Sequence, residues 1–337
     1  MIVSENVPLS THTTLRVGGT ARFFIECESK EDIQNALAFA LEHGLLWSVL
    51  GEGSNVLAGD DVYNGVVIAI RIPGIAFVDA GEEVQITAGA GVAWDALVLE
   101  AARCGLWGLE NLAGIPGTVG AAPVQNIGAY GAEVKDTLKE VSALDTRTGQ
   151  IRILVRDECA FGYRDSIFKF SARFVILSVT FCLQKAAQPS IEYKDLKEAL
   201  AQGTDLSTPA SIGNAVRTIR GRKFPDLSLV GTAGSFFKNP TISEEAYASL
   251  KEKFSDMPGF PNARGVKIPT AFILDHMLGL RGYTEGNISL FENQPLVLVA
   301  RNGATQKEID TFANNIAARV HDATGIFIER EVRNFPT

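Results

Sequence analysis

The sequence predicts an α+β protein with two or three domains, and three observations support this. Its 337 residues are 46% hydrophobic and 21% charged, an ordinary composition for a globular chain that can bury a sizeable core. Runs with helical spacing alternate with strand-like runs, and no internal repeat is present. A Gly-x-Gly turn follows a predicted strand at residues 51–53. Val56 stands where a dinucleotide fingerprint needs its third glycine, and no helical pattern follows, so a Rossmann fold is not expected.

Composition also excludes several classes of function. The formal net charge of −8 argues against nucleic acid as a partner, because such binding needs a basic face. No segment approaches the roughly 18–20 apolar residues of a membrane span, and residues 1–10 lack the pattern of a signal peptide. The four cysteines are scattered beside apolar or small residues, so we expect reduced, partly buried thiols and a cytoplasmic location. The four histidines have no ligand spacing, so no metal is expected.

The first half of the chain mixes strands and helices around one unusual segment. Strands are expected at residues 21–29, 45–50, 65–70, 84–92 and 173–183, with two more around a turn within 140–154. Helices are expected at residues 30–42, where Ser29 is the N-cap, and at 94–104. Between them, residues 105–134 are rich in glycine, irregular and apolar, with no basic residue. Such a run can bury itself and is best explained by a flat ligand that lies against backbone.

In the second half of the chain, most of the expected elements are helices. A boundary is expected at residues 185–190. Helices are expected after Tyr193 and at residues 210–220, 243–254, 268–278 and 305–324. The helix that begins at Ser243 is expected to be capped, and the last helix has a Thr-x-x-Glu cap. Strands are expected at 295–303 and 326–333. A basic cluster follows the second of these helices, with Arg220, Arg222 and Lys223 in an otherwise acidic chain.

Two glycine turns leave alternatives open. GEGSN (residues 51–55) is either an ordinary turn or one whose backbone N–H groups, with Ser54 and Asn55, face a phosphate. GTAGSFFKNP (residues 231–240) is either a turn anchored by two core phenylalanines or a loop that holds Ser235 as a proton donor or acceptor. Neither pattern decides between these alternatives by itself.

Read together, six motifs in order resemble the flavin-dependent UDP-N-acetylenolpyruvoylglucosamine reductase family. They are LGEGSN (50–55), GLENLAGIPGTVGAAPVQNIGAYG (108–131), FGYRDSIFK (161–169), RKFPD (222–226), AGSFFKNP (233–240) and EVR (331–333). The resemblance covers nearly the whole chain. Tyr193 is similar to the tyrosine of the subgroup that closes a loop over the substrate.

The resemblance implies a two-electron reduction in peptidoglycan precursor synthesis. NADPH is the hydride donor, FAD is the non-covalent cofactor, and the enolpyruvyl group of the UDP-sugar becomes the D-lactyl ether of UDP-N-acetylmuramate. A transition state with charge beside a carboxylate needs fixed positive charge and hydrogen-bond donors, which suits an arginine. A monomer that neither binds nucleic acid nor enters a membrane is expected.

The resemblance also assigns residues. The catalytic set is Arg164, Ser235 as proton donor, and Glu331. The residues implied to hold FAD are Leu50, Gly51, Gly53, Ser54, Asn55, Ala113, Ile115, Pro116, Gly117, Gly120, Gln125, Asn126, Gly128 and Ala129. The residues implied to bind substrate or NADPH are Tyr193, Arg220, Lys223, Lys238 and Asn239.

The fold that the resemblance implies is an FAD-binding domain of the PCMH type rather than a Rossmann domain. It would comprise two α+β subdomains in residues 1–187, followed by a linker with the tyrosine loop at 188–204. A substrate-binding α+β domain would span 205–320, and residues 321–337 would return as a strand to the active site. One run departs from the family: residues 288–298 lack an expected histidine, and Asn293 and Gln294 are the candidates to replace it.

Two rival functions remain. A flavin oxidase with the same cradle commonly carries a histidine or cysteine for covalent flavin attachment, and residues 105–134 contain neither, although Cys104 lies just before them. A sugar-nucleotide binder without chemistry would have no need of Arg164, Ser235 and Glu331 together.

Overall fold

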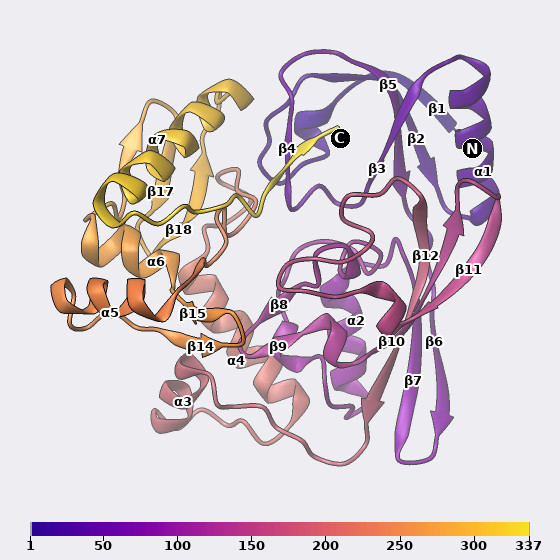
Figure 1. Ribbon diagram of the computed structural model, residues 1–337. Coiled ribbons are helices and arrows are strands. Elements are labelled where there is room, and N and C mark those ends of the chain that lie inside the picture. Colours follow the sequence, from indigo (N-terminus) through magenta and orange to yellow (C-terminus); the bar gives the residue numbers. More distant parts are fainter. Residues whose placement is uncertain (1, 337) are drawn as a thin grey trace. The chain divides into compact units, whose positions relative to one another are not determined.

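The computed structural model describes residues 2–336, which divide into two compact units (Figure 1). The first unit contains the residues up to Val7, Ala21–Glu52 and Asn64–Gly221, and the second contains Pro8–Thr20, Gly53–Tyr63 and the residues from Arg222 onward. Each unit has a hydrophobic core of its own. One of the places where the chain passes from one unit to the other lies within the GEGSN turn.

This division differs from the predicted domain bounds: residues 188–221 belong to the first unit, and Pro8–Thr20 and Gly53–Tyr63, expected in the first domain, belong to the second unit. The physical reason is burial, because Leu196, Leu206 and Ile212 are part of the first core. Whether a functional substrate domain begins at residue 205 stays a prediction.

The first unit contains two large sheets. One has four strands in the order β1-β2-β5-β3, in which β3 and β5 run parallel. The other has five antiparallel strands in the order β11-β10-β12-β7-β6. A short β8–β9 pair lies within the glycine-rich segment. The strands are β1 (Ile2–Pro8), β2 (Thr20–Cys27), β3 (Leu46–Leu50), β5 (Tyr63–Ile70), β6 (Ile75–Ala80), β7 (Glu83–Gly89), β8 (Gly128–Ala129), β9 (Ala132–Glu133), β10 (Leu138–Asp145), β11 (Gln150–Val155) and β12 (Phe174–Gln184).

Four helices accompany these sheets: α1 (Lys30–Glu42), α2 (Trp94–Arg103), α3 (Lys194–Ala201) and α4 (Pro209–Lys223). The predicted cap of α1 is confirmed, since the Ser29 side chain accepts a hydrogen bond from the backbone N–H of Asp32. Its apolar stripe buries Ile33, Ala36 and Ala40, as the helical spacing predicts.

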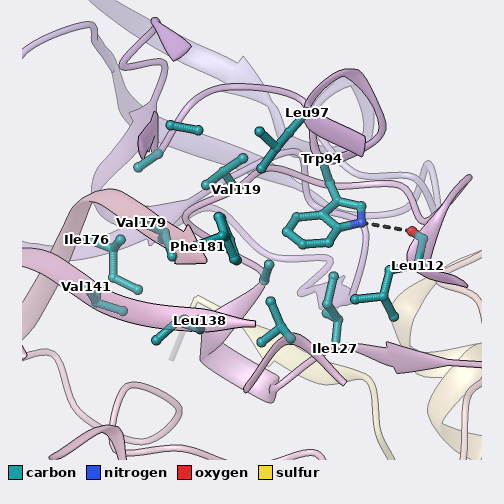
Figure 2. Packing of buried hydrophobic residues seen from close by; sticks show 14 of the residues in the cluster. Trp94, Leu97, Leu112, Val119, Ile127, Leu138, Val141, Ile176, Val179 and Phe181 are labelled. Atoms are coloured by element: carbon teal, nitrogen blue, oxygen red, sulfur yellow. Dashed lines mark hydrogen bonds between the residues drawn. The ribbon is translucent and has the colours of Figure 1, made fainter. Parts of the chain in front are cut away.

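The core of the first unit anchors the glycine-rich segment (Figure 2). The indole Nε1 of Trp94, on α2, donates a hydrogen bond of 2.9 Å to the carbonyl of Leu112. The same indole meets the ring of Phe181, on β12, edge to face at 5.8 Å. The chain therefore enters the run after Leu112 from a fixed position, because its last anchor is buried between a helix and a sheet.

The second unit is built from smaller pieces. Its sheets have the orders β13-β15-β14, β16-β17-β18 and β19-β4, and the last pair is parallel. The strands are β4 (Val56–Ala58), β13 (Thr241–Ile242), β14 (Phe260–Asn262), β15 (Gly265–Lys267), β16 (Thr284–Glu285), β17 (Ile288–Phe291), β18 (Gln294–Ala300) and β19 (Arg333–Phe335). The helices are α5 (Glu244–Lys253), α6 (Thr270–Phe272) with a π-helical turn over Ile273–Met277, and α7 (Gln306–Thr324). The run that departs from the family forms the β17–β18 hairpin, where Phe291 pairs with Gln294.

The predicted caps in this unit are confirmed. Ser243 accepts a hydrogen bond from the Ala246 N–H at the start of α5. Thr305 and Glu308 form a capping box at the start of α7.

Two predictions were wrong. Residues 326–333 do not form one regular strand, because this stretch meets two different partners: Arg330 pairs with Phe237, and Arg333 pairs with Val56. Phe327 is accordingly 77% exposed. The second error concerns Cys104, which is exposed at the end of α2, although the other three cysteines are buried or half-buried.

Candidate functional site

The residues that the sequence selects fall in both units, and each group is described by itself. The first unit holds Leu50, Gly51, Ala113, Ile115, Pro116, Gly117, Gly120, Gln125, Asn126, Gly128, Ala129, Arg164, Tyr193 and Arg220. The second unit holds Gly53, Ser54, Asn55, Lys223, Ser235, Lys238, Asn239 and Glu331.

In the first unit, one end of the run 113–120 is clamped at Gly114. The carboxylate of Asp95 accepts a hydrogen bond of 2.7 Å from the Gly114 N–H, while the Nε of Arg220 donates to the Gly114 carbonyl at 3.0 Å. The same carboxylate takes two hydrogen bonds from Arg217, at 3.0 and 2.8 Å. Gly114 has a φ of +69°, a conformation that glycine adopts without strain. The N–H and the carbonyl of Gly114 are therefore both held by side chains, one from α2 and one from α4.

The charges around Asp95 affect its protonation. Burial alone would raise its pKa, but hydrogen bonds from Arg217 and the Gly114 N–H, with the charges of Arg217 and Arg220, outweigh it and lower the pKa. Asp95 is consequently ionised at neutral pH and remains a full acceptor for the Gly114 N–H.

The other end of the run is fixed at Gly117. Its N–H donates to the Glu52 carboxylate at 2.9 Å, and its carbonyl accepts from the Trp94 N–H at 2.9 Å. Three residues later, the Gly120 N–H donates to the Ala90 carbonyl at 2.9 Å, and a Cβ at Gly120 would lie 2.6 Å from the Ala90 Cβ. Residues 114–120 thus form an irregular segment whose shape is set at both ends.

Asn126 joins three parts of the first unit. Its side-chain amide donates to Gly162 and to Glu133, each at 2.9 Å, and its Oδ1 accepts from the Lys135 N–H at 3.1 Å. Asn126 is fully buried. Its side chain therefore holds loops together, and any contact with a ligand would come from its backbone.

Arg164 lies on the loop 161–169, and its guanidinium reaches the glycine-rich segment. Its Nη2 donates a hydrogen bond of 2.7 Å to the Gly128 carbonyl. The guanidinium carbon lies 5.4 Å from the centre of the Tyr163 ring. The charged end of Arg164 therefore contacts a segment expected to hold the cofactor.

Tyr193 and Arg220 lie near a buried tyrosine. The ring of Tyr193, at the start of α3, meets the ring of Tyr130 edge to face at 5.2 Å. Burial raises the pKa of Tyr130 to about 12. Burial lowers the pKa of Arg220, against the smaller opposing effects of Tyr130 and Asp95. One of the donors of Arg220 is thus used within the protein, in its hydrogen bond to the Gly114 carbonyl of the glycine-rich segment.

In the second unit, the stretch around Ser235 is extended and forms isolated β-bridges on both sides. The Phe236 N–H donates to the Leu296 carbonyl, and the Phe236 carbonyl accepts from the Glu331 N–H, each at 2.8 Å. Ser235 pairs with Val297 in an isolated bridge. Phe236 and Phe237 are both 1% exposed, so the expectation that they anchor this stretch in a core is confirmed.

The stretch 329–333 brings Glu331 and Asn55 together. Asn55 Nδ2 donates to the Glu331 carbonyl at 3.3 Å, and the Arg333 N–H donates to the Asn55 carbonyl at 3.2 Å. Glu331 is 9% exposed. The second half of the GEGSN turn therefore lies beside the EVR motif, and the EVR motif bonds through Glu331 to Phe236, the residue after Ser235.

The two residues after the phenylalanines also have partners inside the second unit. The Lys238 ammonium forms an ion pair of 2.8 Å with Glu329. The Asn239 Oδ1 accepts from the Thr270 N–H at 2.9 Å, at the start of α6. Lys223 is half-buried at the end of α4.

Sequence reasoning missed Asp95, Arg217 and Glu52. Asp95 and Arg217 are 122 residues apart, so no local pattern could pair them. Glu52 lies inside the GEGSN motif, and its position in that motif could have indicated a role for it. Lys169 likewise lies inside the FGYRDSIFK motif, but the motif assigned it no role.

Two kinds of site are absent from the part of the chain that the structure describes. Within residues 2–336, no three His, Cys, Asp or Glu side chains gather in a way that could hold a metal ion. In the same range, no helix has the length and apolar character needed to cross a membrane.

Comparisons with known proteins add to this geometry. A family model described as FAD binding domain matches residues 21–154. A second, described as UDP-N-acetylenolpyruvoylglucosamine reductase, C-terminal domain, matches residues 226–335. The UDP-N-acetylenolpyruvoylglucosamine reductase of Pseudomonas syringae pv. syringae (strain B728a) is 40% identical over 333 residues, which cover 98% of each chain. That of Ralstonia nicotianae (strain ATCC BAA-1114 / GMI1000) is 40% identical over 339 residues, with 98% of each chain covered.

Solved structures agree with the fold. The UDP-N-acetylenolpyruvylglucosamine reductase of Thermus caldophilus is similar with a TM-score of 0.68 and 25% identity, over 99% of this chain and all 100% of that one. The 6-hydroxy-D-nicotine oxidase of Arthrobacter nicotinovorans has a TM-score of 0.51 and 13% identity, over 96% of this chain and 83% of that one. The second likeness concerns the fold alone. The predicted α+β FAD-binding fold is confirmed.

Proposed function

Because the chain belongs to the UDP-N-acetylenolpyruvoylglucosamine reductase family, we propose that it uses NADPH to convert the enolpyruvyl ether of that UDP-sugar into the D-lactyl ether of UDP-N-acetylmuramate. It is a flavin-dependent oxidoreductase, and its cofactor is FAD. The proposal gives the protein a role in peptidoglycan precursor synthesis, as a cytoplasmic monomer.

The residues of the first unit suit this cofactor. Residues 111–132 carry no charged side chain, so no carboxylate of this run would repel a pyrophosphate. The Gly114 and Gly117 peptides are fixed by side chains of the protein itself, so the run is pre-shaped for a ligand. We propose that FAD is held non-covalently by Leu50, Gly51, Gly53, Ser54, Asn55, Ala113, Ile115, Pro116, Gly117, Gly120, Gln125, the Asn126 backbone, Gly128 and Ala129.

When bound, FAD supplies hydride transfer between NADPH and the enolpyruvyl double bond. The protein must stabilise the negative charge that develops beside the substrate carboxylate. We assign this to Arg164, since a guanidinium is a permanently charged, planar donor that matches a carboxylate. Glu331, which is nearly buried, is assigned an assisting role at the same charge.

Proton delivery is assigned to Ser235. The observation that carries this part of the proposal is the ladder in which the residue after Ser235 is bonded on both sides, to Leu296 and to Glu331. These bonds fix the backbone next to the Ser235 hydroxyl and place that backbone beside the EVR motif. A general acid needs such a defined position within hydrogen-bond reach of its target.

Anionic groups of the substrate or NADPH are assigned to Tyr193, Arg220, Lys223, Lys238 and Asn239. The contacts within each unit refine these assignments. Arg220 also holds Gly114, and Lys238 also pairs with Glu329. Lys223, in the basic cluster after α4, is proposed to act chiefly by binding. Asn293 and Gln294 lie at the turn of the β17–β18 hairpin and remain the candidates to replace the family histidine.

The test is the absorbance of the FAD-loaded protein in two steps. NADPH should bleach the yellow protein, and the enolpyruvyl UDP-sugar should restore its colour. Replacement of Ser235 by alanine should leave the first step unchanged and slow the second at least about a hundred-fold, the lower range for a general acid.

Ser243→Ala is the matched control, because Ser243 caps α5 in the same unit. It should leave both steps unchanged and lower the free energy of unfolding by about 1 kcal/mol. A protein that takes up no FAD would contradict the function, and a normal second step in Ser235→Ala would contradict the assignment of the acid alone.

A further inference from the structure

The backbone of Arg164 has an unusual conformation. Its φ is +54°, in the left-handed region. For a residue with a side chain, this region costs roughly 1–2 kcal/mol relative to ordinary backbone. Such strain persists where the surroundings over-determine it, and it gathers at functional sites. A neighbouring group must therefore favour this conformation.

Lys169, five residues later, supplies such a contact. Its ammonium donates a hydrogen bond of 2.6 Å to the Arg164 carbonyl. Lys169 is 3% exposed, which is rare for a lysine because a buried ammonium is costly unless its protons are bonded. A charge-assisted hydrogen bond is roughly twice as strong as a neutral one. The buried charge thus acts on the peptide that follows the strained residue.

Other contacts hold the same loop. The Asp165 N–H, in the peptide that follows Arg164, donates a long hydrogen bond of 3.4 Å to the Gly162 carbonyl, and two further bonds act elsewhere. Asn126 donates to the Gly162 carbonyl, and the Ser166 hydroxyl donates to the Val124 carbonyl at 2.7 Å. These bonds join the loop 161–169 to the glycine-rich segment on either side of Arg164. Neither touches the Arg164 peptide, whose orientation decides where its Cα–Cβ bond points.

We propose that Lys169 is a positioning residue for Arg164. Its ammonium keeps the Arg164 carbonyl in place, holds φ in the left-handed region, and so directs the guanidinium along the glycine-rich segment. The functional part of this inference rests on the role proposed above for Arg164 at the substrate carboxylate. Without Lys169, the backbone at Arg164 is free to change φ and ψ together, which relieves the strain and carries the guanidinium away from Gly128. A displacement of about 1 Å at a catalytic group can cost about a hundred-fold in rate.

A double-mutant cycle tests this, with Lys169→Met and Arg164→Ala. Lys169→Met should slow the restoration of colour by the enolpyruvyl UDP-sugar at least about ten-fold, while bleaching by NADPH and the Kd for FAD, measured by titration of the apoprotein, change less than about two-fold. The double variant should be no slower than Arg164→Ala alone, because Lys169 acts through Arg164. Losses that multiply would overturn the proposal.

The matched control is Lys139→Met, which removes an exposed lysine of β10 that bonds to Gln85. Both steps and the Kd for FAD should match the wild type. Lys169→Gln is a milder variant in case Lys169→Met does not fold. It retains a donor but no charge, and it should show the same non-additivity at a smaller amplitude.

A second readout does not depend on the proposed function. Arg164→Gly removes the strain, since glycine adopts positive φ freely. Lys169→Met should therefore lower the Tm of the FAD-loaded protein by at least about 3 °C, and by less than half of that in an Arg164→Gly background. Equal losses in both backgrounds would overturn the positioning role. If the wild type never reacts with the UDP-sugar, the proposed function fails, and this cycle still decides the role of Lys169.

Discussion

The run 113–120 of the first unit and the stretch 235–239 of the second are fixed in different ways. The first is irregular: the carboxylates of Asp95 and Glu52 hold the N–H groups of Gly114 and Gly117, and backbone bonds hold its second half, from Gly117 to Gly120. The second is an extended stretch held by backbone bonds from Phe236 to Leu296 and to Glu331. A backbone ladder survives most side-chain changes, whereas a loop held by carboxylates depends on particular residues. The two regions should therefore differ in their sensitivity to substitution.

The largest effect is expected for Asp95→Ala. It leaves the Gly114 N–H without its acceptor and Arg217 without its anion, and we expect a loss of about 2–3 kcal/mol in unfolding free energy. The Kd for FAD should rise at least about ten-fold, or about 1.4 kcal/mol, because the run loses its preset shape. Urea unfolding and flavin titration measure the two quantities.

The matched control for Asp95→Ala is Arg103→Ala, which removes an exposed ion pair at the other end of the same helix, with Glu100. It should change stability by less than about 0.5 kcal/mol. pH gives an independent check. Since the folded pKa of Asp95 is lowered, its contribution is complete above the unfolded value near pH 4 and is lost as the pH falls through the folded pKa. The stability gap between wild type and Asp95→Ala should therefore shrink on acidification below pH 4. A gap that widens would contradict the ion pair.

An intermediate effect is expected for Gly120→Ala. The new Cβ would lie 2.6 Å from the Ala90 Cβ and 3.0 Å from its carbonyl oxygen, so backbone must move. Overpacking of this kind costs about 1–2 kcal/mol, and thermal unfolding should show it.

Gly221→Ala provides a comparison of opposite sign. Gly221 lies in α4, and no atom outside its own helical turn lies within 4 Å of the place that a Cβ would occupy. Alanine should therefore stabilise the protein by about 0.5–1 kcal/mol through helix propensity. If both substitutions were neutral, the close approach at Gly120 would not matter for the shape of the run.

The smallest effect is expected for Glu329→Gln in the second unit. The change removes the Lys238 ion pair, in which Glu329 has a side chain that is 76% exposed, while the backbone bond from the Lys238 N–H to the Glu329 carbonyl remains. Exposed pairs contribute about 0.2–1 kcal/mol, and this one should contribute still less in high salt. Urea unfolding at two salt concentrations measures it. A loss as large as that of Asp95→Ala would break the comparison between the two regions.

Most of the fold, and the family, could be predicted from the sequence. Caps at Ser29, Ser243 and Thr305 are local chemistry, since the capping side chain and its N–H partner lie within three residues. The apolar spacing of α1 and the burial of Phe236 and Phe237 follow in the same way. Six motifs in family order were enough to predict FAD and the reductase family. Each motif alone is ambiguous, but six of them in the same order as in the family are specific.

Other features could not be predicted locally. The last stretch looked like one alternating strand, but its pairing with Phe237 and then with Val56 depends on where those partners lie in the fold. The strand β6 was not predicted, although its sequence IAFVDA is largely apolar, and most of its residues are exposed in the structure.

The sequence by itself determined the helices, the irregular glycine-rich segment and the set of residues with suitable chemistry, because those depend on neighbours within a few positions. The tertiary structure decided which groups meet: Asp95 with Arg217 across 122 residues, Asn55 with the Glu331 carbonyl across 276, and Lys169 with a strained Arg164 carbonyl. Such contacts depend on how distant segments pack, and the left-handed backbone of Arg164 is stable only in the surroundings that this packing creates.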